Sequence, residues 1–557
     1  MENRMLPPNN TNGLPRKLNR GVPAWKEKIS HLEGTVYNPL IWADIPDPDV
    51  IRVGEIYYMT STTMHFNPGV PVMKSYDLVH WNIVNYVYDT LEDGDEQRLS
   101  NGRSEYGKGS WASSLRFHSG KFYVVFSSNS AGKTYIYQTL DIEKGPWTRS
   151  TLAFYHDMSL LFDDDGRVYL VHGSGDIRIT ELTSDATMEK EDGLNKVIIR
   201  NASLIAGPNV GLPAEGAHIQ KINGYYYISL ITWPKGGMRT QLIYRSDTID
   251  GPYEGRVALQ DAGIAQGGLI DTCSGDWYAL LFGDRGSVGR IPYLVPVTWK
   301  DDWPILGYQG KVPDSLSLPL HRTESNLVTS DEFDQRSESA SSSSNLALAW
   351  QWNHNPDGHS WSLTERPGFL RLKNGRICRE LLDARNTLTQ RSFGPESSGC
   401  IAIEVGHMKD GDTAGLAALQ ENYGFVGVKM NGSAKSIVMA NGSTAQLQVI
   451  ESIPLTQDRV YLKIEFDFYH LTDKAYFYYS LDGNLWTPIG NTLQMTYTLP
   501  HFVGYRFALF NYATVTAGGY VDFDYFRVDD QITANHKSNS DLRSTEDPLL
   551  TKEVDGK

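Results

Sequence analysis

Three acidic residues occupy matching positions in a set of internal repeats. A glycine followed by aromatic and β-branched residues recurs at Gly54, Gly120, Gly166, Gly224 and Gly275. Counting back from each glycine leads to Asp47 at seven residues, and to Trp111, Asp157, Glu215 and Gln266 at nine. Carboxylates brought together shift one another's pKa, which provides an acid and a base at one pH. Glycoside hydrolysis requires such a pair.

The repeats that carry these residues predict the blades of a β-propeller. They are spaced by 46 to 66 residues. A glycine permits the positive φ of a tight turn, and the aromatic segment after it suits a strand packed on a neighbouring sheet. Repeats of this length in an all-β chain are typical of propeller blades. The strand before each glycine would be the innermost one, so the five matching positions should converge on the central channel.

A second domain is expected after the repeats end. The stretch PDSLSLPLHRTESNLVTS is typical of a linker, and later segments such as CIAIEVG, FVGVKM and VYLKIEFDFY have the period of two that indicates antiparallel strands. These strands predict a β-sandwich. We therefore expect an N-terminal arm (1–36), a five-bladed propeller (37–310), a linker (311–330), a β-sandwich (331–530) and a disordered tail (531–557).

The charge and hydropathy of the chain exclude some classes of binding partner. The formal net charge of −15 argues against nucleic acid, whose binding requires a basic surface. No apolar run is long enough for a membrane span, and the first residues lack the apolar core of a signal peptide. The chain as written is therefore expected to be cytoplasmic, or secreted if a leader has been removed. Its three cysteines show no metal-binding spacing.

Four motifs within the repeats resemble glycoside hydrolase family 43. They are NPLIWADIPDPDVI, WASSLRFHSGKFYVVF, HDMSLLFDDDGRVYLVHG and EGAHIQKINGYYYI. The resemblance implies that Asp47 is the general base, that Glu215 is the general acid, and that Asp157 raises the pKa of the acid and holds it in place. The predicted sandwich resembles the jelly-roll, concanavalin-like accessory domain of many members.

The sequence departs from the family pattern at two positions. The first motif reads Asp-Pro-Asp where many members have Asp-Pro-Ser, so Asp49 is a rival base on the same strand face as Asp47. Many members also have a histidine, associated with an axial metal or water, where this chain has Gln266. We therefore expect no cofactor for catalysis.

Other residues are candidates for contact with the sugar. Trp111 and Gln266 share the channel position with the carboxylates. Arg290 resembles the family arginine that reaches the sugar subsite, although an ordinary surface arginine is the alternative. Trp42 and His65 are further candidates, with a place in the core as the alternative for Trp42.

The expected substrate is a neutral oligosaccharide or polysaccharide derived from arabinoxylan. Segments such as SSLRFHSG and DRGSVGRIPYLVPVTW are similar to the branch rich in α-L-arabinofuranosidases. This resemblance implies an exo-acting, inverting enzyme that releases L-arabinofuranose. A β-xylosidase, or an enzyme with both activities, is the nearest alternative. A non-catalytic carbohydrate-binding propeller and carboxylates that hold calcium between blades are more remote ones.

A structural calcium site is a separate expectation for the sandwich. Asp331 lies in its opening segment and Asp524 in its closing one. If the first and last strands pair, the two carboxylates would meet and could bind calcium, which prefers oxygen ligands. Two unrelated carboxylates at strand ends are the alternative.

Overall fold

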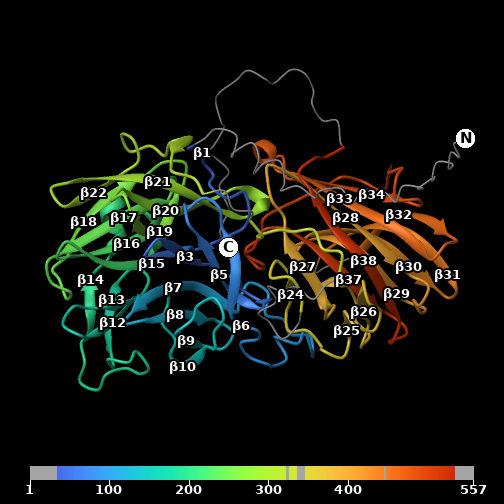
Figure 1. The fold of residues 1–557 in the computed structure, drawn as a ribbon, viewed down its shortest axis with the longest axis horizontal. Helices are drawn as coiled ribbons and strands as arrows, with labels where there is room; N and C mark the ends of the chain where they lie inside the picture. The colour runs from blue at the N-terminus through green and yellow to red at the C-terminus, as the bar shows by residue number, and fades with distance from the viewer. Residues whose placement is uncertain (1–33, 322–324, 335–344, 444–446, 534–557) are drawn as a thin grey trace, which may run out of the picture.

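The computed structural model describes residues 34–321, 325–334, 345–443 and 447–533. The predicted arm before residue 34 and the predicted tail after residue 533 lie outside these ranges. The described chain is built almost wholly from strands, as predicted, and forms a propeller beside a β-sandwich (Figure 1). No helix within the described ranges is long and apolar enough to cross a bilayer.

The propeller consists of five four-stranded antiparallel sheets within the described residues, which confirms the predicted blade number. Blade 1 contains β2 (Asp49–Val53), β3 (Ile56–Thr60), β5 (Gly69–Ser75) and β6 (Asn82–Tyr88). Blade 2 contains β7 (Ser110–His118), β8 (Lys121–Ser128), β9 (Lys133–Thr139) and β10 (Thr148–Ala153). Blade 3 contains β11 (Ser159–Phe162), β12 (Val168–His172), β13 (Ile177–Leu182) and β14 (Asn195–Ile199). Blade 4 contains β15 (Val210–Ile222), β16 (Tyr225–Pro234), β17 (Thr240–Ser246) and β18 (Glu254–Leu259), and blade 5 contains β19 (Ala265–Asp271), β20 (Trp277–Asp284), β21 (Arg290–Lys300) and β22 (Trp303–Leu306).

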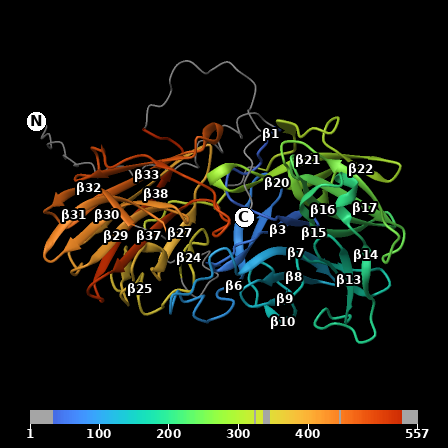
Figure 2. The ribbon, with the colours of Figure 1, turned by 180° about the vertical axis from the view of Figure 1, so that it is seen from behind.

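The first strand of each blade lines the propeller axis. β2 contacts β7, β7 contacts β11, β11 contacts β15, β15 contacts β19, and β19 contacts β2 again, so the ring closes. The blades follow one another around this ring in chain order, from blue through green in Figure 2. The innermost position predicted for these strands is therefore the one observed.

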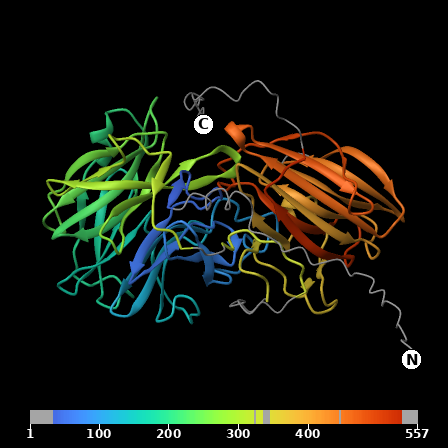
Figure 3. The ribbon, with the colours of Figure 1, turned by 45° about the horizontal axis from the view of Figure 1, so that its top comes forward.

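Two sheets form the sandwich, which is the orange and red part of Figure 3. One sheet has the order β32 (Leu447–Leu455), β31 (Ala434–Gly442), β30 (Tyr423–Asn431), β29 (Asp412–Leu419), β37 (Arg506–Ala513), β27 (Thr387–Arg391), β24 (Gln351–Asn353) and β4 (Phe66–Asn67). The other has the order β25 (Trp361–Ser362), β26 (Leu370–Lys373), β38 (Tyr520–Asp529), β28 (Glu396–Glu404), β33 (Arg459–Asp467), β34 (Lys474–Ser480) and β35 (Thr487–Pro488), with β36 (Leu493–Gln494) also paired to β34. Two short 3-10 helices, η3 (Leu381–Asp383) and η4 (Tyr469–Leu471), lie in the sandwich segment, and two others, η1 (Ala202–Ala206) and η2 (Gly286–Val288), lie in the propeller segment. Alternation of buried apolar residues along these strands supplies the core between the sheets.

The two domains share main-chain structure. β4 belongs to the chain segment of blade 1, yet it pairs with β24 as the edge strand of a sandwich sheet. Near the start of the described chain, β1 (Thr35–Tyr37) pairs with β23 (Ser315–Ser317). After β23 the chain passes along blade 1, where the Asn326 side chain accepts a hydrogen bond from the amide of Ile83 in β6 and donates one to its carbonyl. The sandwich is therefore fixed against blade 1, and its loops can contribute to a site on the propeller.

Candidate active site

The five matched residues lie at the beginning of the innermost strands. Trp111, Glu215 and Gln266 lie within β7, β15 and β19, and Asp47 and Asp157 lie two residues before β2 and β11. These strands are irregular at this level. Asp47, Asp157 and Gln266 have φ of 50°, 44° and 63°, a region that side chains other than glycine rarely adopt. β-bulges interrupt β7 and β15 at the other two positions. Such distortions cluster at functional sites, where they redirect side chains.

Asp47 is held by two donors. Nη1 of Arg290 lies 3.1 Å from each carboxylate oxygen, and the Thr62 hydroxyl donates to Oδ2 at 2.6 Å. Asp47 and Arg290 are both buried. Burial opposes the charge of Arg290, but the negative charge of Asp47 raises the pKa of the guanidinium overall. Arg290 is therefore not a surface residue, and its guanidinium holds the Asp47 carboxylate in place.

Glu215 is more accessible and has neighbours of a different kind. Its Oε2 lies 3.0 Å from Nε2 of His156 and accepts a hydrogen bond of 3.1 Å from the Ser174 hydroxyl. The hydrogen bond with Glu215 raises the pKa of His156 to about 9, against the effect of burial. His156 and Glu215 therefore hold a proton between them at neutral pH.

Asp157 lies between these groups. It is buried, and its Oδ2 accepts a hydrogen bond of 3.2 Å from the amide of Gly216. Burial raises the pKa of Asp157 to about 6, and the charges of Glu215 and Asp47 add to this rise while His156 opposes it. The three carboxylates thus act on one another electrostatically. A proton can be held within this group near neutral pH.

Asp49, the rival base, has a different environment. It accepts hydrogen bonds of 2.8 Å from both the guanidinium of Arg116 and the amide of Leu115, and Nδ1 of His218 lies 3.3 Å away. Burial alone would raise the pKa of Asp49, but Arg116 and His218 bring it down to about 2. Arg116 also donates to Ser159 of blade 3 and to the carbonyl of Ile219 in blade 4. Asp49 is therefore part of a paired network that joins blades.

An aromatic wall of the site comes from both domains. Trp111 lies 5.8 Å, between ring centroids, from Phe502 in a sandwich loop, and the Arg290 guanidinium lies 4.2 Å from the Phe502 ring. Among the described residues, the buried Nε1 of Trp111 and Nε of Arg290 have no hydrogen-bond partner. Two free donors beside aromatic rings suit a sugar, which offers hydroxyl oxygens and apolar ring faces.

The sandwich loop is held in place by Asp44. Its carboxylate accepts hydrogen bonds from the amides of Arg290, at 2.8 Å, and of Gly504, at 2.9 Å. A Cβ at Gly504 would lie 2.2 Å from the carbonyl oxygen of Val288, so glycine is required for this close approach. Sequence reasoning missed Phe502 because the repeat pattern ends long before it. The glycine beside an aromatic in HFVGY was the available signal.

The other predicted sugar contacts divide into two groups. The Gln266 side chain lies beside Gly216, where an added Cβ would be 2.9 Å from Gln266 Cδ, so Gln266 is adjacent to Glu215. His65 requires correction, whereas contact of Trp42 with the sugar stays a prediction. The Trp42 ring packs against Gly394 of the sandwich, and its carbonyl accepts the Gly394 amide.

His65 is only 1% exposed. Its ring is enclosed by Tyr106, His354 and His501, with centroids at 4.8, 4.9 and 6.1 Å. Burial lowers the pKa of His65 well below its usual value, so the ring is neutral. His65 therefore supports the loop that carries Phe502 from behind, and it does not reach the sugar directly.

The carboxylates predicted to bind calcium have separate partners. Asp331 pairs with Phe526 through the main chain, so the opening and closing segments of the sandwich do meet. Its carboxylate, however, accepts hydrogen bonds from the Trp350 indole at 2.9 Å and the Phe333 amide at 2.8 Å. Asp524 forms an ion pair with Arg459. The two segments therefore meet and each carboxylate has a protein partner of its own, and calcium binding stays a prediction.

Metal-ligand spacing occurs elsewhere. Among the described residues, the nitrogen of His156 and carboxylate oxygens of Asp157 and Glu215 lie within 4.8 Å of one another and could hold a metal ion. Of these atoms, those of His156 and Glu215 are hydrogen-bonded to each other, and Asp157 acts on His156 through its charge. Hydrolysis by a carboxylate pair requires no metal.

Comparison with known proteins identifies the family. The sequence matches "Glycosyl hydrolases family 43" over residues 36–304 and "Beta xylosidase C-terminal Concanavalin A-like domain" over residues 341–529. A solved structure described as a bifunctional GH43-CE protein of Bacteroides eggerthii is 51% identical, with a TM-score of 0.87 over 90% of this chain. The chain belongs to glycoside hydrolase family 43, and it spans 64% of that bifunctional protein.

Two curated relatives have different named activities. A β-xylosidase of Formosa agariphila is 28% identical over 89% of this chain and 90% of its own length. A non-reducing end α-L-arabinofuranosidase of Bacteroides ovatus is 32% identical over 64% of this chain and 68% of its own length. The protein is thus a glycoside hydrolase of the xylosidase and arabinofuranosidase group.

Proposed function

We propose that this protein is an exo-acting, inverting α-L-arabinofuranosidase that acts on arabinoxylan fragments. The observation that carries the proposal is the unequal surroundings of Asp47 and Glu215 on two sides of Asp157. Asp47 is buried and its two carboxylate oxygens are held by the Arg290 guanidinium and the Thr62 hydroxyl, as an oriented base would be. Glu215 is more exposed and is hydrogen-bonded to His156 and to the Ser174 hydroxyl, where it can meet a leaving group.

In the proposed reaction, Asp47 takes a proton from water as the water oxygen attacks the anomeric carbon. Glu215 gives its proton to the glycosidic oxygen, and the bond between that oxygen and the anomeric carbon breaks. Arg290 and Thr62 fix the orientation of the base, so that one lone pair can face the water. Asp157, which lies against the main chain next to Glu215, holds the acid in place. Attack by water on the face opposite the leaving group inverts the configuration.

Phe502 supports exo action. Its ring closes one side of the site from the sandwich domain, facing Trp111 on the propeller. A site bounded in this way suits a terminal sugar that enters from one direction, whereas the interior of a long chain would have to pass the wall. The free donors on Trp111 and Arg290 would bind hydroxyl groups of this terminal sugar.

A β-xylosidase is the second candidate. It is favoured by the Formosa relative, which aligns over more of this chain than the arabinofuranosidase relative does. Both substrates are pentosides with a non-reducing end, and both can use the same three carboxylates.

Release of 4-nitrophenol from α-L-arabinofuranoside and β-D-xylopyranoside, measured side by side, tests the proposal. We expect a higher kcat/KM on the arabinofuranoside, and no fall in viscosity when the enzyme acts on arabinoxylan. A higher value on the xylopyranoside would establish the second candidate instead. Glu215→Gln serves as the control for contaminating activity. No release from either substrate by the folded enzyme would indicate a carbohydrate-binding propeller.

A further inference from the structure

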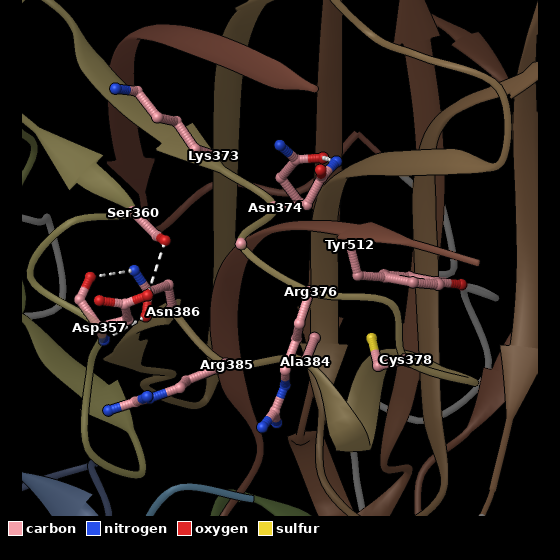
Figure 4. A pocket seen from close by; sticks show the side chains of 12 residues that line it. Asp357, Ser360, Lys373, Asn374, Arg376, Cys378, Ala384, Arg385, Asn386 and Tyr512 are labelled. Atoms are coloured by element: carbon pink, nitrogen blue, oxygen red, sulfur yellow. Dashed lines mark hydrogen bonds between the residues drawn. The ribbon is translucent and has the colours of Figure 1, made fainter. Parts of the chain in front are cut away.

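A polar pocket lies in the sandwich domain, apart from the carboxylates of the propeller (Figure 4). Its volume is about 180 Å³. The lining residues include Ser360, Lys373, Arg376, Arg385 and Tyr512. Pockets for drug-sized ligands measure about 300–1,000 Å³. This one is therefore matched to a single small group such as one sugar ring.

The lining of the pocket carries more positive than negative charge: it includes Lys373, Arg376 and Arg385 but also Asp357, and Lys373 is paired with Glu365 at 2.6 Å. Nη2 of Arg376 donates to the carbonyls of Leu99 and Asp383, and Arg385 donates to the carbonyls of Asn355 and Pro356. All four acceptors are neutral. Within the described parts of the chain, neither guanidinium has a carboxylate within ion-pair distance.

The electrostatic surroundings agree with this arrangement. Burial lowers the pKa of Arg385; Asp357, which also lines the pocket, opposes this, and the positive charges of Arg376 and Arg98 lower the pKa further. The carboxylate of Asp357 is already used by the Ser360 hydroxyl and the His359 amide. A positive pocket of this kind in a chain of net charge −15 attracts an anion.

A carboxylate suits the pocket better than a neutral group. Guanidinium groups bind carboxylates through paired, charge-assisted hydrogen bonds, which are stronger than bonds between neutral groups. Arg376 and Arg385 are both labelled at the lower side of the pocket in Figure 4, and Ser360 and Lys373 lie on its other side. The Arg376 and Arg385 side chains extend in different directions in Figure 4, so a carboxylate would bind to one guanidinium at this lower side while hydroxyl and amide groups of the lining contact the ring.

We propose that this pocket is a secondary binding site for a hexuronic acid, such as an acidic side group of a xylan chain. The choice of a sugar acid among carboxylates rests on the proposed function, whereas the binding of a carboxylate rests on the pocket alone. Arg376 also contacts Leu99, in the propeller segment between β6 and β7 that leads to Trp111. A bound acidic group would thus be retained at the junction of the two domains, close in sequence to the aromatic wall of the active site.

Titration calorimetry on the full chain, with methyl β-D-glucuronide as the probe, tests this site. Methyl β-D-glucoside has the same ring without the charge, and acetate has the charge without the ring. We expect the glucuronide to bind at least about tenfold more tightly than either, because hydrogen bonds to a charged group add to contacts with the ring. Equal binding of glucuronide and glucoside, or of glucuronide and acetate, would overturn the proposal, as would no binding.

Variants place the binding in the pocket. Arg376→Gln and Arg385→Gln should each weaken glucuronide binding about tenfold. Arg379→Gln is the matched control, because Arg379 is an exposed arginine of the same segment and does not line the pocket. Lys373→Gln removes a positive charge of the lining and its pair with Glu365 but no bond to the main chain, so it replaces either arginine variant that fails to fold. Unchanged binding in the folded pocket variants would contradict the assignment.

Activity distinguishes this proposal from the proposed function. The pocket variants should retain the wild-type kcat on 4-nitrophenyl α-L-arabinofuranoside, which has no acid group. If that substrate is not hydrolysed but the pocket variants still lose glucuronide binding, the proposed function fails and the carboxylate site stands. If hydrolysis is normal and glucuronide does not bind, the secondary site fails alone.

Discussion

Asp157 and Asp49 are both buried carboxylates on the propeller axis, and their pKa values move in opposite directions. Burial and the neighbouring charges of Glu215 and Asp47 raise the pKa of Asp157 to about 6. Burial also acts on Asp49, but Arg116 and His218 overcome it and lower the pKa to about 2. Burial therefore does not decide the state of a carboxylate by itself. The charged groups next to each carboxylate determine whether it is ionised.

The two levels of the channel serve different purposes. At the level of Asp49, one guanidinium reaches four blades, since Arg116 belongs to blade 2 and bonds to Asp49, Ser159 and Ile219. At the level of Asp47, three carboxylates share few positive partners, and the backbone adopts unusual φ values. The ion-paired residues at the level of Asp49 stabilise the ring of blades. At the level of Asp47, carboxylates outnumber their positive partners, and such an arrangement allows proton transfer.

Removing the proposed base or acid should have the largest effect. Asp47→Asn and Glu215→Gln should each lower kcat/KM by at least about a hundredfold, because neither amide can exchange a proton at neutral pH. Folding should be preserved because both substitutions keep the size of the side chain. Steady-state kinetics with circular dichroism melting measures both quantities. Activity within tenfold of wild type in either variant would remove that residue from the mechanism.

Asp49→Asn should show the converse pattern. It breaks a buried ion pair and leaves Arg116 without its carboxylate, which should lower the free energy of unfolding by about 3–5 kcal/mol. The folded fraction should keep most of its turnover. Denaturant unfolding and active-site titration separate the two effects. If Asp49→Asn is stable and inactive while Asp47→Asn is active, the two aspartates have been assigned the wrong roles.

Asp157→Asn should stabilise the protein while lowering its activity. The folded pKa of about 6 exceeds the unfolded value of 3.8, so wild-type stability is lost as the pH rises through 6. Removing this ionisation should raise the free energy of unfolding at pH 7 by roughly 2 to 3 kcal/mol, and by little at pH 3.5. Unfolding curves at the two pH values measure the difference. A gain that does not depend on pH would contradict this origin.

His156→Gln should have the smallest effect. The folded pKa of His156 is about 9 and the ordinary value is 6.5, so its stabilising contact with Glu215 is fully present below pH 6.5 and is lost as the pH rises through 9. Since the imidazole is 32% exposed, screening limits the loss in the variant to about 1 kcal/mol below pH 6.5. The stability difference between variant and wild type should vanish above pH 10.

The repeats made much of this site predictable. The glycines marked equivalent strands, so counting back from them found Asp47, Asp157 and Glu215 without any structure. Period two could not separate Asp47 from Asp49, because it places both on one strand face. The positive φ of Asp47 breaks that alternation, and the two side chains consequently reach different arginines.

The contacts between the propeller and the sandwich could not be predicted from the repeat pattern. Phe502 reaches the site through a loop whose position depends on Asp44 and on the close approach at Gly504. His65 was expected at the sugar but is enclosed by rings that come from the sandwich as well as the propeller. The pairing of the sandwich segments at Asp331 was anticipated, whereas the indole of Trp350 that takes up its carboxylate was not.

The anomer released first tests the central claim that Asp47 acts as a base on water. Asp47 and Glu215 come from blades 1 and 4, so a separation of about 6.5–9.5 Å between their carboxyl groups, with room for water, is expected of an inverting pair. Proton NMR in the first minutes of hydrolysis, before mutarotation, should show the β anomer of arabinose released from an α-L-arabinofuranoside. Initial release of the α anomer would contradict both inversion and the role of Asp47.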